Sequence, residues 1–589
     1  MKETTLDNSI ESKRRRRRAL KKTIEKIMNA VFFVCGAAAI AAVALITVYM
    51  VVSGLPAIRE IGLLDFLFGT EWKSTAAEPK FGILPFILTS IWGTLGAIVI
   101  GVPVGLLTAV FLSKVASRRV ASVVRPAVEL LAGIPSVVYG LIGMMVLVPA
   151  VMELFHLKNG TCLFAAILVL AIMILPSIIS VSETALNAVP PEYEEASLAL
   201  GATKIETIFK VSIPAAKSGI VAGIVLGIGL ADGRDDGGGQ RGQYAGPVQE
   251  RHLPDDGRRQ GDERCQRPAE AGAVQHRAGA VLLYHAHQQP AELLPEERGE
   301  TMNGQDRRSG RRRAYDIFFK TVVYLSAFLT VALLVVLIGY IFVRGLPHIT
   351  GQLLSTAPSV LKDTIGILPN ILNTLYIILF TLLIALPLGV GAAVYLTEYA
   401  SNKTFIRIVE FATETLAGIP SIIYGLVGML FFAQMLGFQT SLLSGGCTLV
   451  IMILPTIIRT TQESLKTVPQ SYREGALGLG ATKWYMIRTI ILPSSVDGIV
   501  TGCILSIGRI VGESAALLFT AGVGTVVANN IFSAFTRSGG TLSVALYMYV
   551  SERGEFDVGF AIAAILMLLV LCINGAAKLV EKKLRRKTK

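Results

Sequence analysis

Charged residues are scarce in this chain of 589 residues: only 16% are Asp, Glu, Lys or Arg, whereas 52% are hydrophobic. The mean hydropathy is correspondingly high, at +0.59. Soluble globular proteins contain about 25% charged residues, so this composition excludes an ordinary soluble protein. It is typical of a chain that crosses a membrane many times.

Cysteine is also rare, and its six copies form no close pair and no metal-ligand spacing. They are Cys35, Cys162, Cys265, Cys447, Cys503 and Cys572. This distribution indicates neither a disulfide framework nor a zinc site. We expect each cysteine to act as a small apolar side chain, and we expect no metal and no cofactor.

The sequence lacks the Gly-x4-Gly-Lys-Ser/Thr phosphate loop, so the chain does not hydrolyse ATP through that motif. The Gly-Ala-Thr-Lys sequences that begin at Gly201 and Gly480 do not have its spacing. No nucleophile and base, and no set of metal ligands, stand together in the apolar segments, which argues against a membrane-embedded enzyme. Any ATP-driven process that involves this chain therefore needs a separate ATPase subunit.

Long apolar runs are abundant, and a run of about 20 residues is long enough to cross the hydrocarbon core of a bilayer. In the first half they lie near 30–53, 82–112, 127–151 and 162–181. In the second half they lie near 317–343, 366–396, 412–436, 441–458, 495–521 and 558–578. The first run is too long for a removable signal peptide and lacks a small-residue cleavage site, so we expect it to be a true membrane span.

The two halves of the chain repeat each other. Leu131-Ala-Gly-Ile-Pro-Ser-Val-Val-Tyr-Gly-Leu-Ile-Gly-Met144 returns as Leu416-Ala-Gly-Ile-Pro-Ser-Ile-Ile-Tyr-Gly-Leu-Val-Gly-Met429. Two shorter matches flank this block in the same order: 82–85 with 366–369 and 173–176 with 452–455. Duplicated transport modules usually pair about a pseudo-symmetry axis, with the substrate path between them. We therefore predict an all-α polytopic membrane protein with two tandem modules of about five to six transmembrane helices each.

Basic residues indicate the orientation of the predicted spans. A cluster from Lys13 to Arg18 precedes the first span, and the positive-inside tendency places it in the cytoplasm. Counting crossings from this point places the loop with Glu153 and His156 outside, and the segments 183–217 and 462–488 inside. The net charge of +13 is then mostly a topology signal. Nucleic-acid binding is the alternative explanation of these basic runs, but no folded basic domain supports it.

A third repeated stretch lies in the predicted cytoplasmic segments. Glu195-Ala-Ser-Leu-Ala-Leu-Gly-Ala-Thr-Lys204 matches Glu474-Gly-Ala-Leu-Gly-Leu-Gly-Ala-Thr-Lys483, and a proline follows each, at Pro214 and Pro493. The pattern predicts a short helix, a turn at the glycine and a second helix along the membrane surface. Small residues there let another protein approach closely, and the acidic residue offers a polar contact. An ordinary connecting loop is the alternative, but the repetition favours a docking element.

These residues resemble the coupling-loop signature of binding-protein-dependent ABC transporter permeases, which reads Glu-Ala-Ala, three residues, Gly, nine residues, Ile-x-Leu-Pro. The second half matches it at Glu474, Gly475, Ala476, Gly480, Ile490, Leu492 and Pro493. The first half matches it at Glu195, Ala196, Ser197, Gly201, Val211, Ile213 and Pro214. The resemblance implies that both loops seat in a groove of an ATP-hydrolysing subunit.

The phrase Leu-Ala-Gly-Ile-Pro-Ser followed by Tyr-Gly-Leu resembles a narrower group, the phosphate-specific uptake system, in which two permease subunits called C and A form a heterodimer. The first half, from about 30 to 231, is similar to the C subunit, and the second half, from about 315 to 580, is similar to the A subunit. The resemblance implies a phosphate importer in the cytoplasmic membrane of a prokaryote. Its implied partners are two copies of an ABC ATPase subunit, an extracytoplasmic phosphate-binding protein, membrane lipid and phosphate itself. Import of another oxyanion, such as sulfate, molybdate or phosphonate, is the alternative.

Ionisable residues within a membrane span are costly and usually functional. Arg509 and Glu513 have the i, i+4 spacing that places two residues on one helix face. They form either a structural ion pair or a substrate site, because Arg donates to two phosphate oxygens at once and Glu513 can orient it. The family resemblance favours the substrate site over a purely structural scaffold. Arg459 and Glu463 repeat the spacing at the end of another span, where they line the path or face the cytoplasm.

The first half departs from the pattern in its fifth span. Alignment of the two halves places Leu230 opposite Arg509 and Arg234 opposite Glu513. From Asp232 to Thr301 the chain turns into Gly, Arg, Asp, Gln and Pro with hardly an apolar run, and we expect disorder because such a composition buries too little surface to fold. A linker is the simplest interpretation. It does not explain why the fifth span stops halfway and the sixth is absent.

A shift of one base in the reading frame explains both features. The shifted codons of Arg234-Asp235-Asp236 can encode Glu-Thr-Met, and those of 283–293 can encode an apolar segment suited to the missing span. The codons of Met302-Asn303 begin ATG-AA, so the shifted frame meets the stop codon TGA where a second gene would start. We therefore predict two overlapping genes joined by a one-base insertion near codons 230–233. The predicted parts are a truncated first module at 1–231, an aberrant polar segment at 232–301 and a complete second module at 302–589.

Overall fold

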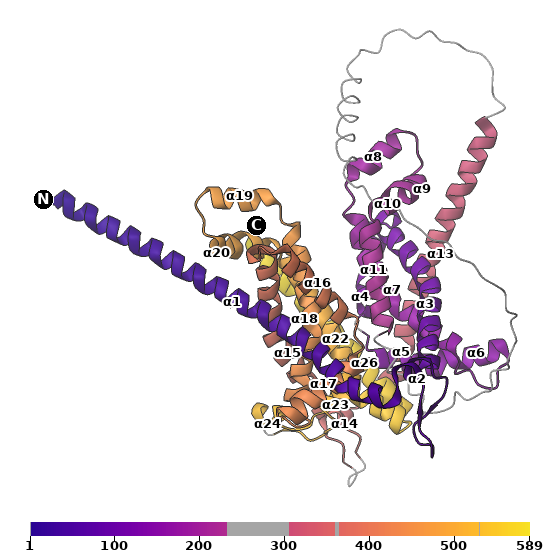
Figure 1. Cartoon of the computed structure of the whole chain (residues 1–589). Helices are drawn as coiled ribbons and strands as arrows, with labels where there is room; N and C mark the ends of the chain where they lie inside the picture. The colour runs from indigo at the N-terminus through magenta and orange to yellow at the C-terminus, as the bar shows by residue number, and fades with distance from the viewer. Residues whose placement is uncertain (1, 133, 233–304, 360–363, 529, 589) are drawn as a thin grey trace, which may run out of the picture. The chain divides into compact units, whose positions relative to one another are not determined.

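A computed structural model of the chain describes residues 2–132, 134–232, 305–359, 364–528 and 530–588. Helices make up most of these residues, and the predicted all-α class is confirmed (Figure 1). The described strands are β1 (Trp72–Lys73) and β2 (Lys80–Phe81), which pair antiparallel in a small hairpin. Residues 233–304 lie outside the described ranges, so the expected disorder of the segment 232–301 stays a prediction.

The chain divides into two compact units, Met1–Gly239 together with Asp316–Lys589, and Gln240–Tyr315. The helices of both sequence repeats belong to the first unit. Those of the first repeat are α1 (Lys2–Ile61), α2 (Leu63–Phe68), α3 (Leu84–Val110), η1 (Phe111–Val115), α4 (Arg118–Ala132), α5 (Ser136–Ile142), η2 (Gly143–Leu147), α6 (Val148–Phe155), α7 (Leu163–Asn187), α8 (Pro191–Ala199), α9 (Lys204–Thr207), η3 (Ile208–Ser212), α10 (Ile213–Ala215) and α11 (Lys217–Asp232).

The second repeat begins with α13 (Gln305–Gly345), whose first residues belong to the smaller unit. Its other helices are η5 (Leu346–His348), α14 (Gly351–Ser355), α15 (Leu368–Val394), η6 (Tyr395–Tyr399), α16 (Lys403–Ala417), α17 (Ser421–Gly428), η7 (Met429–Met435), α18 (Leu442–Thr467), α19 (Gln470–Gly478), α20 (Lys483–Met486), η8 (Ile487–Ile491), α21 (Leu492–Ser494), α22 (Val496–Gly512), α23 (Ala515–Thr520), α24 (Ile531–Phe535), α25 (Leu542–Tyr547), η9 (Met548–Glu552) and α26 (Phe556–Thr588).

Within the described residues, eight helices are long and apolar enough to cross a membrane, or up to eleven if each of three bent helix pairs is one span. Most of the predicted apolar runs coincide with these helices, which confirms a protein with many membrane spans. These helices follow from long runs of Leu, Ile, Val and Ala in the sequence. When lipid surrounds such a run, its backbone N–H and C=O groups can form their hydrogen bonds only within a helix.

Three predicted spans are wrong in detail, because each is broken. The run 412–436 forms α16 and α17, which are bent by 100° around Pro420. The run 127–151 is likewise divided between α4 and α5 near Pro135. Proline lacks the N–H that a helix interior needs and disfavours helical conformation in the preceding residue. The run 495–521 is divided between α22, which ends at Gly512, and a separate helix α23.

The helix pairs α3–α7 and α15–α18 are equivalent in the two repeats and pack closely through glycines. A Cβ atom at Gly101 would lie 2.6 Å from the Cδ1 atom of Ile174, and one at Gly389 would lie 2.6 Å from the Cγ2 atom of Ile457. Small residues allow such close approach between membrane helices, which gain their association energy largely from van der Waals contact. Shorter helices of each repeat pack against these pairs, as α4 does against α7 and α16 against α18.

The first helix of each repeat packs against the other repeat. Phe32 of α1 lies 5.7 Å, between ring centroids, from both Tyr399 of η6 and Trp484 of α20. Phe319 of α13 lies 4.5 Å from Phe209 of η3. This exchange of first helices ties the two repeats to each other at the short helices that follow α7 and α18.

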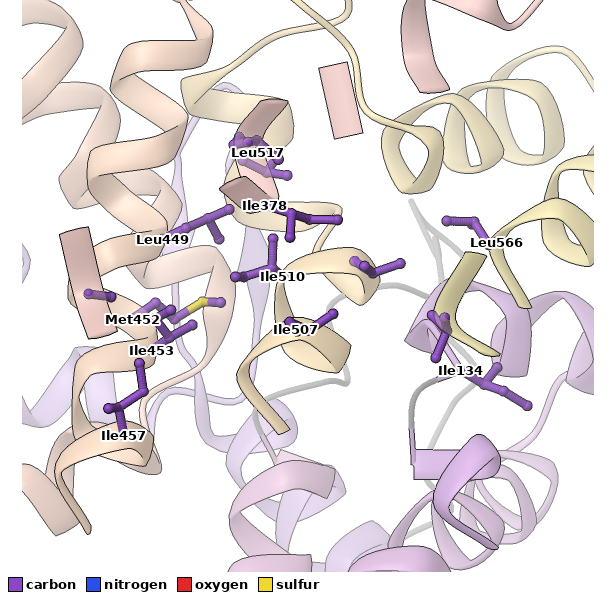
Figure 2. Close-up of a cluster of buried hydrophobic side chains, with 14 of the residues drawn as sticks. Ile134, Ile378, Leu449, Met452, Ile453, Ile457, Ile507, Ile510, Leu517 and Leu566 are labelled. Carbon is purple, nitrogen blue, oxygen red and sulfur yellow. The ribbon is translucent and has the colours of Figure 1, made fainter. Parts of the chain in front are cut away.

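Buried side chains hold α22 against its neighbours (Figure 2). Ile507 and Ile510 of α22 are buried, and they belong to the same hydrophobic core as Ile453 of α18 and Leu517 of α23. Because Ile510 immediately follows Arg509, the packed face of α22 fixes the backbone that carries this arginine. The core therefore sets the position of the cation that sequence analysis selected.

Candidate functional site

The two repeated polar stretches fold as predicted, with a short helix, a glycine turn and a second short helix. In the first repeat α8 leads through Gly201 to α9, and in the second α19 leads through Gly480 to α20. Gly201 has a φ of 82° and Gly480 a φ of 80°. Only glycine adopts this left-handed conformation without steric cost, which explains its place in both turns.

A threonine that sequence analysis did not select starts the second helix of each element. The Thr203 side chain accepts a hydrogen bond from the N–H of Glu206, and the Glu206 side chain accepts one from the N–H of Thr203. In the second repeat Thr482 accepts from the N–H of Tyr485. Threonine with glutamate three residues later is a capping-box signature, so the sequence did contain the signal in the first repeat.

The predicted coupling residues lie mostly on the surface of these elements. Glu195, Ala196 and Glu474 are exposed, whereas Ala476 is buried. At Gly475, as at the two turn glycines, an added Cβ atom would meet nothing within 4 Å. The structure thus brings each set together on one element and leaves the acidic residue free to contact another molecule.

Both elements also expose large apolar side chains, which sequence analysis did not select. Leu200 is 90% exposed and Leu479, at the equivalent position, is 91% exposed. The same elements expose two further pairs of equivalent residues. These are Tyr193 with Tyr472 and Leu198 with Leu477. Apolar surface that recurs at the same positions in two repeats marks an interaction surface.

Arg509 lies on α22 and is partly buried. No hydrogen bond or ion pair joins it to another residue in the part of the chain that the structure describes. Tyr424 of α17 belongs to the bent helix pair formed by α16 and α17. The Tyr424 hydroxyl donates to the carbonyl oxygen of Leu416 at 2.8 Å, across the sharp bend between α16 and α17.

The same contact recurs in the first repeat, where the Tyr139 hydroxyl donates to the carbonyl oxygen of Leu131 at 2.7 Å. A helix that ends inside a membrane protein leaves carbonyl groups without intrahelical partners. The tyrosine of the repeated Leu-Ala-Gly-Ile-Pro-Ser-x-x-Tyr block satisfies one of them. This explains why Pro and Tyr occur together in both copies of the block.

Glu513 caps α22 rather than lying within it, and no ion pair joins it to Arg509 among the described residues. The helix α22 ends at Gly512, and Glu513 has extended backbone dihedrals of φ −80° and ψ 118°. Its carboxylate accepts a hydrogen bond from the N–H of Ala516 at 3.0 Å, at the start of α23. The i, i+4 rule applies only within a continuous helix. Here the buried carboxylate satisfies the first turn of a new helix instead.

Arg459 and Glu463 form the expected contact on α18, with the Arg459 Nε atom 3.1 Å from Glu463 Oε1. Glu414 of α16 lies 3.8 Å from the same guanidinium. All three side chains are well exposed, and exposed ion pairs contribute at most about 1 kcal/mol. Arg459 is therefore already neutralised by carboxylates, unlike Arg509.

The described ranges contain no group of three or more His, Cys, Asp or Glu side chains able to hold a metal ion. Cys35, Cys162, Cys447 and Cys503 are partly buried and Cys572 is exposed, all with free thiols. Cys265 lies outside the described residues.

Comparison with known proteins gives one family for both repeats. The family described as "Binding-protein-dependent transport system inner membrane component" matches residues 101–232 and 385–586. The probable ABC transporter permease protein YqgI of Bacillus subtilis is 35% identical over 267 residues, which are 43% of this chain and 90% of that protein.

Several relatives are described as phosphate transport system permease protein PstA, and two of them serve as examples. The protein of Haemophilus influenzae is 30% identical over 266 residues, 45% of this chain and 92% of its own length. The protein of Mycobacterium leprae is 37% identical over 201 residues, 33% of this chain and 64% of its own length. The relatives are components of permeases rather than enzymes.

Proposed function

The chain belongs to the family of binding-protein-dependent transport system inner membrane components, and on this basis we propose that it forms the translocation pathway of an ATP-driven importer of inorganic phosphate. The family establishes a multi-pass permease of the inner membrane with two tandem modules. The proposal adds the substrate, the source of energy and the residues that act.

Arg509 is the observation that supports an anionic substrate. It is a partly buried cation on a helix that the hydrophobic core holds in place, and no carboxylate neutralises it within the described residues. A guanidinium binds a phosphate group through two parallel hydrogen bonds, so it suits a tetrahedral oxyanion. The similarity to two phosphate transport permeases favours phosphate over sulfate, molybdate or phosphonate.

The proposal assigns Arg459 and Glu463 only a minor role in the substrate pathway. Their ion pair is exposed near the end of α18, where it can face an open pathway. Because Arg459 has two carboxylate neighbours, we assign it at most a transient contact with the anion. The role proposed for Glu513 is structural: its hydrogen bond to α23 stabilises the backbone conformation near Arg509.

The elements α8–α9 and α19–α20 are the proposed docking sites for two copies of an ABC ATPase subunit. Each presents an exposed glutamate beside an exposed leucine, namely Glu195 with Leu200 and Glu474 with Leu479. Apolar contact area provides affinity, and the acidic group provides a directed polar contact. An extracytoplasmic phosphate-binding protein would deliver the substrate at the opposite membrane face, and the N-terminus would lie in the cytoplasm with the docking sites.

The domain boundaries remain those of the frameshift proposal, 1–231, 232–301 and 302–589. In its support, α11 carries no cation at the position where α22 of the second module carries Arg509. Leu230 occupies the position that corresponds to Arg509. The pathway residues of the first module would lie in the alternative reading frame.

A reconstituted system tests the function directly. The chain is placed in liposomes with an ABC ATPase subunit and a phosphate-binding protein, and the uptake of phosphate, sulfate and molybdate is measured beside ATP hydrolysis. We expect phosphate uptake that depends on ATP, and its loss in Glu474→Lys with membrane insertion unchanged. Glu552→Lys, an equal charge change at an exposed residue of η9, serves as the control. Normal phosphate uptake in Glu474→Lys contradicts the docking role, and uptake of sulfate or molybdate instead of phosphate contradicts the substrate.

A further inference from the structure

Two ion pairs occupy equivalent places in the two repeats with their charges reversed. In the first repeat the ammonium group of Lys114, on η1, pairs with the carboxylate of Glu194, on α8. In the second repeat the carboxylate of Glu398, on η6, lies 3.0 Å from the guanidinium of Arg473, on α19. The cation thus lies on the membrane helix in one repeat and on the docking element in the other.

The equivalence of these positions follows from the elements themselves. Lys114 is the fourth residue of η1 and Glu398 is the fourth residue of η6, and both π-helical turns follow a helix of 27 residues that begins Leu-Pro. Glu194 and Arg473 are likewise the fourth residues of α8 and α19, which are nine residues long. Both members of the pair have therefore changed sign together.

Both pairs are built into the protein rather than placed loosely on its surface. The Arg473 side chain is 13% exposed and Glu398 is 5% exposed. The Arg473 guanidinium also donates to the carbonyl oxygens of Leu465, at 2.8 Å, and of Val468, at the end of α18. A cation at the end of a helix complements its unsatisfied carbonyl groups and its dipole.

In the first repeat the anion on the docking element finds a different second partner. The Ser212 hydroxyl, at the end of η3, donates to Glu194 at 2.9 Å. The residue at the position equivalent to Ser212 is the apolar Ile491, which has no hydroxyl to offer. Each repeat therefore surrounds its own sign of charge with matching donors or acceptors.

We propose that Lys114–Glu194 and Glu398–Arg473 are positioning pairs that fix each docking element to the membrane helix of its own module, and that their opposite polarity makes the two elements non-interchangeable. If α19 took the place of α8, Arg473 would face Lys114. If α8 took the place of α19, Glu194 would face Glu398. Like charges brought together in a partly buried site repel and lose their hydrogen bonds.

The pairs also couple movement of each docking element to movement of a membrane helix. The exposed leucines of each docking element lie on or just after a short helix whose fourth residue pairs with the π-helical turn that follows α3 or α15. A push on the element therefore moves the end of a membrane helix. This mechanical part of the proposal rests on the docking role proposed above, whereas the positioning part does not.

Hydrogen–deuterium exchange of the full chain in detergent micelles tests the positioning part. We expect Lys114→Glu and Glu194→Arg, each alone, to speed exchange of the α8 amides at least about tenfold, since each change brings two like charges together in a partly buried site. The double variant Lys114→Glu with Glu194→Arg gives the first repeat the polarity of the second. It should return exchange to within about threefold of the original value, since the attraction is restored.

Two controls keep the experiment interpretable. Lys114→Arg preserves the charge and should leave exchange unchanged, which shows that η1 tolerates substitution. Lys210→Glu reverses an exposed residue that pairs with Glu206 at 3.7 Å on the neighbouring turn, and it should also have no effect on α8. Exchange in the double variant as fast as in either single variant would overturn the proposal.

The same variants, reconstituted with the ATPase subunit, separate this inference from the proposed function. We expect ATP hydrolysis coupled to uptake to fall in the single variants and to recover in the double variant. Exchange that follows the predicted pattern while hydrolysis stays constant in all variants would support the positioning pairs and overturn the docking role. Failure of the exchange pattern itself would overturn the pairs and leave the docking role standing.

Discussion

The Glu513 carboxylate accepts a hydrogen bond from the backbone N–H of Ala516 at 3.0 Å, and this contact joins the end of α22 to the start of α23. The Glu513 backbone is held as well, because the Ser543 hydroxyl donates to its carbonyl oxygen at 2.6 Å. Both acceptor groups of this residue are thus engaged near Arg509. The arginine itself has no carboxylate partner within the described residues, and the proposed function assigns its charge to the substrate anion.

Substitution of Arg509 tests that availability. We expect Arg509→Gln to reduce phosphate uptake by about ten- to a hundredfold, because a hydrogen bond to a charged group contributes about 1.5–3 kcal/mol. Arg509→Lys should recover only part of the activity, since an ammonium group does not reproduce the two-oxygen geometry of a guanidinium. Initial uptake rates in proteoliposomes measure both effects. Equal rates for Arg509→Gln and the original chain would show that Arg509 does not meet the substrate.

Substitution of Glu513 separates a structural from an electrostatic role. Glu513→Gln keeps an acceptor for the Ala516 N–H, so we expect stability and uptake to change little. Glu513→Ala removes the acceptor and should lower the free energy of unfolding by about 0.5–2 kcal/mol, the usual effect of losing a helix cap. Thermal unfolding in detergent measures the stability. Loss of uptake in Glu513→Gln without loss of stability would show instead that the negative charge acts on Arg509 or on the substrate.

Gly480 provides a test of the docking element as a structural unit. Its φ of 80° is unfavourable for a residue with a Cβ atom, so Gly480→Val should destabilise the α19–α20 turn by about 1–3 kcal/mol. Gly478, at the end of α19, has open space around its Cβ position and an ordinary φ. Gly478→Ala is therefore a matched control and should leave the turn intact. Limited proteolysis at the turn reports the difference, and equal protection of the two variants would contradict the strain argument.

Leu200 and Leu479 test the docking surface without disturbing the fold. Each side chain is at least 90% exposed, so Leu200→Asp and Leu479→Asp should not change thermal stability. Each should weaken binding of the ATPase subunit at least about tenfold, because full burial of a leucine contributes roughly 1.5–3 kcal/mol. Affinity is measured by titrating the purified ATPase subunit against the chain in detergent. Unchanged affinity in both variants would place the ATPase contact elsewhere.

The repeated sequence made the helix–turn–helix fold of α8–α9 and α19–α20 predictable, whereas the surroundings of Arg509 were only partly so. Gly201 and Gly480 mark turns by residue type, and Arg459 with Glu463 meet because α18 continues through both. The i, i+4 spacing of Arg509 and Glu513 had the same form, but α22 stops between them. When a helix ends inside an apolar run, the hydrophobicity of the sequence does not change at that point. Hydrophobicity alone therefore could not predict the end of α22.

The positioning pairs were hidden for another reason, since Lys114 and Glu194 are far apart in the sequence and only the folded chain brings them together. A signal did exist in the alignment of the two repeats. Lys114 aligns with Glu398 and Glu194 aligns with Arg473, so two positions reverse charge together. Within a duplicated chain, such a paired reversal indicates that the two positions are in spatial contact.

The proposed frameshift can be tested by restoring the predicted reading frame. Deletion of one base near codon 231 should yield two proteins, the second of which starts at Met302, and the first should gain an apolar sixth span in place of the polar residues that follow Asp232. Completion of both modules supplies each with a full set of spans, so the two proteins together should transport phosphate faster than the fused chain. Mass spectrometry of the products and uptake in proteoliposomes measure the two outcomes. A single product after the deletion, or faster uptake by the fused chain, would contradict the frameshift. As a matched control, a three-base deletion at the same codon keeps the original frame and should leave the fused chain and its transport unchanged.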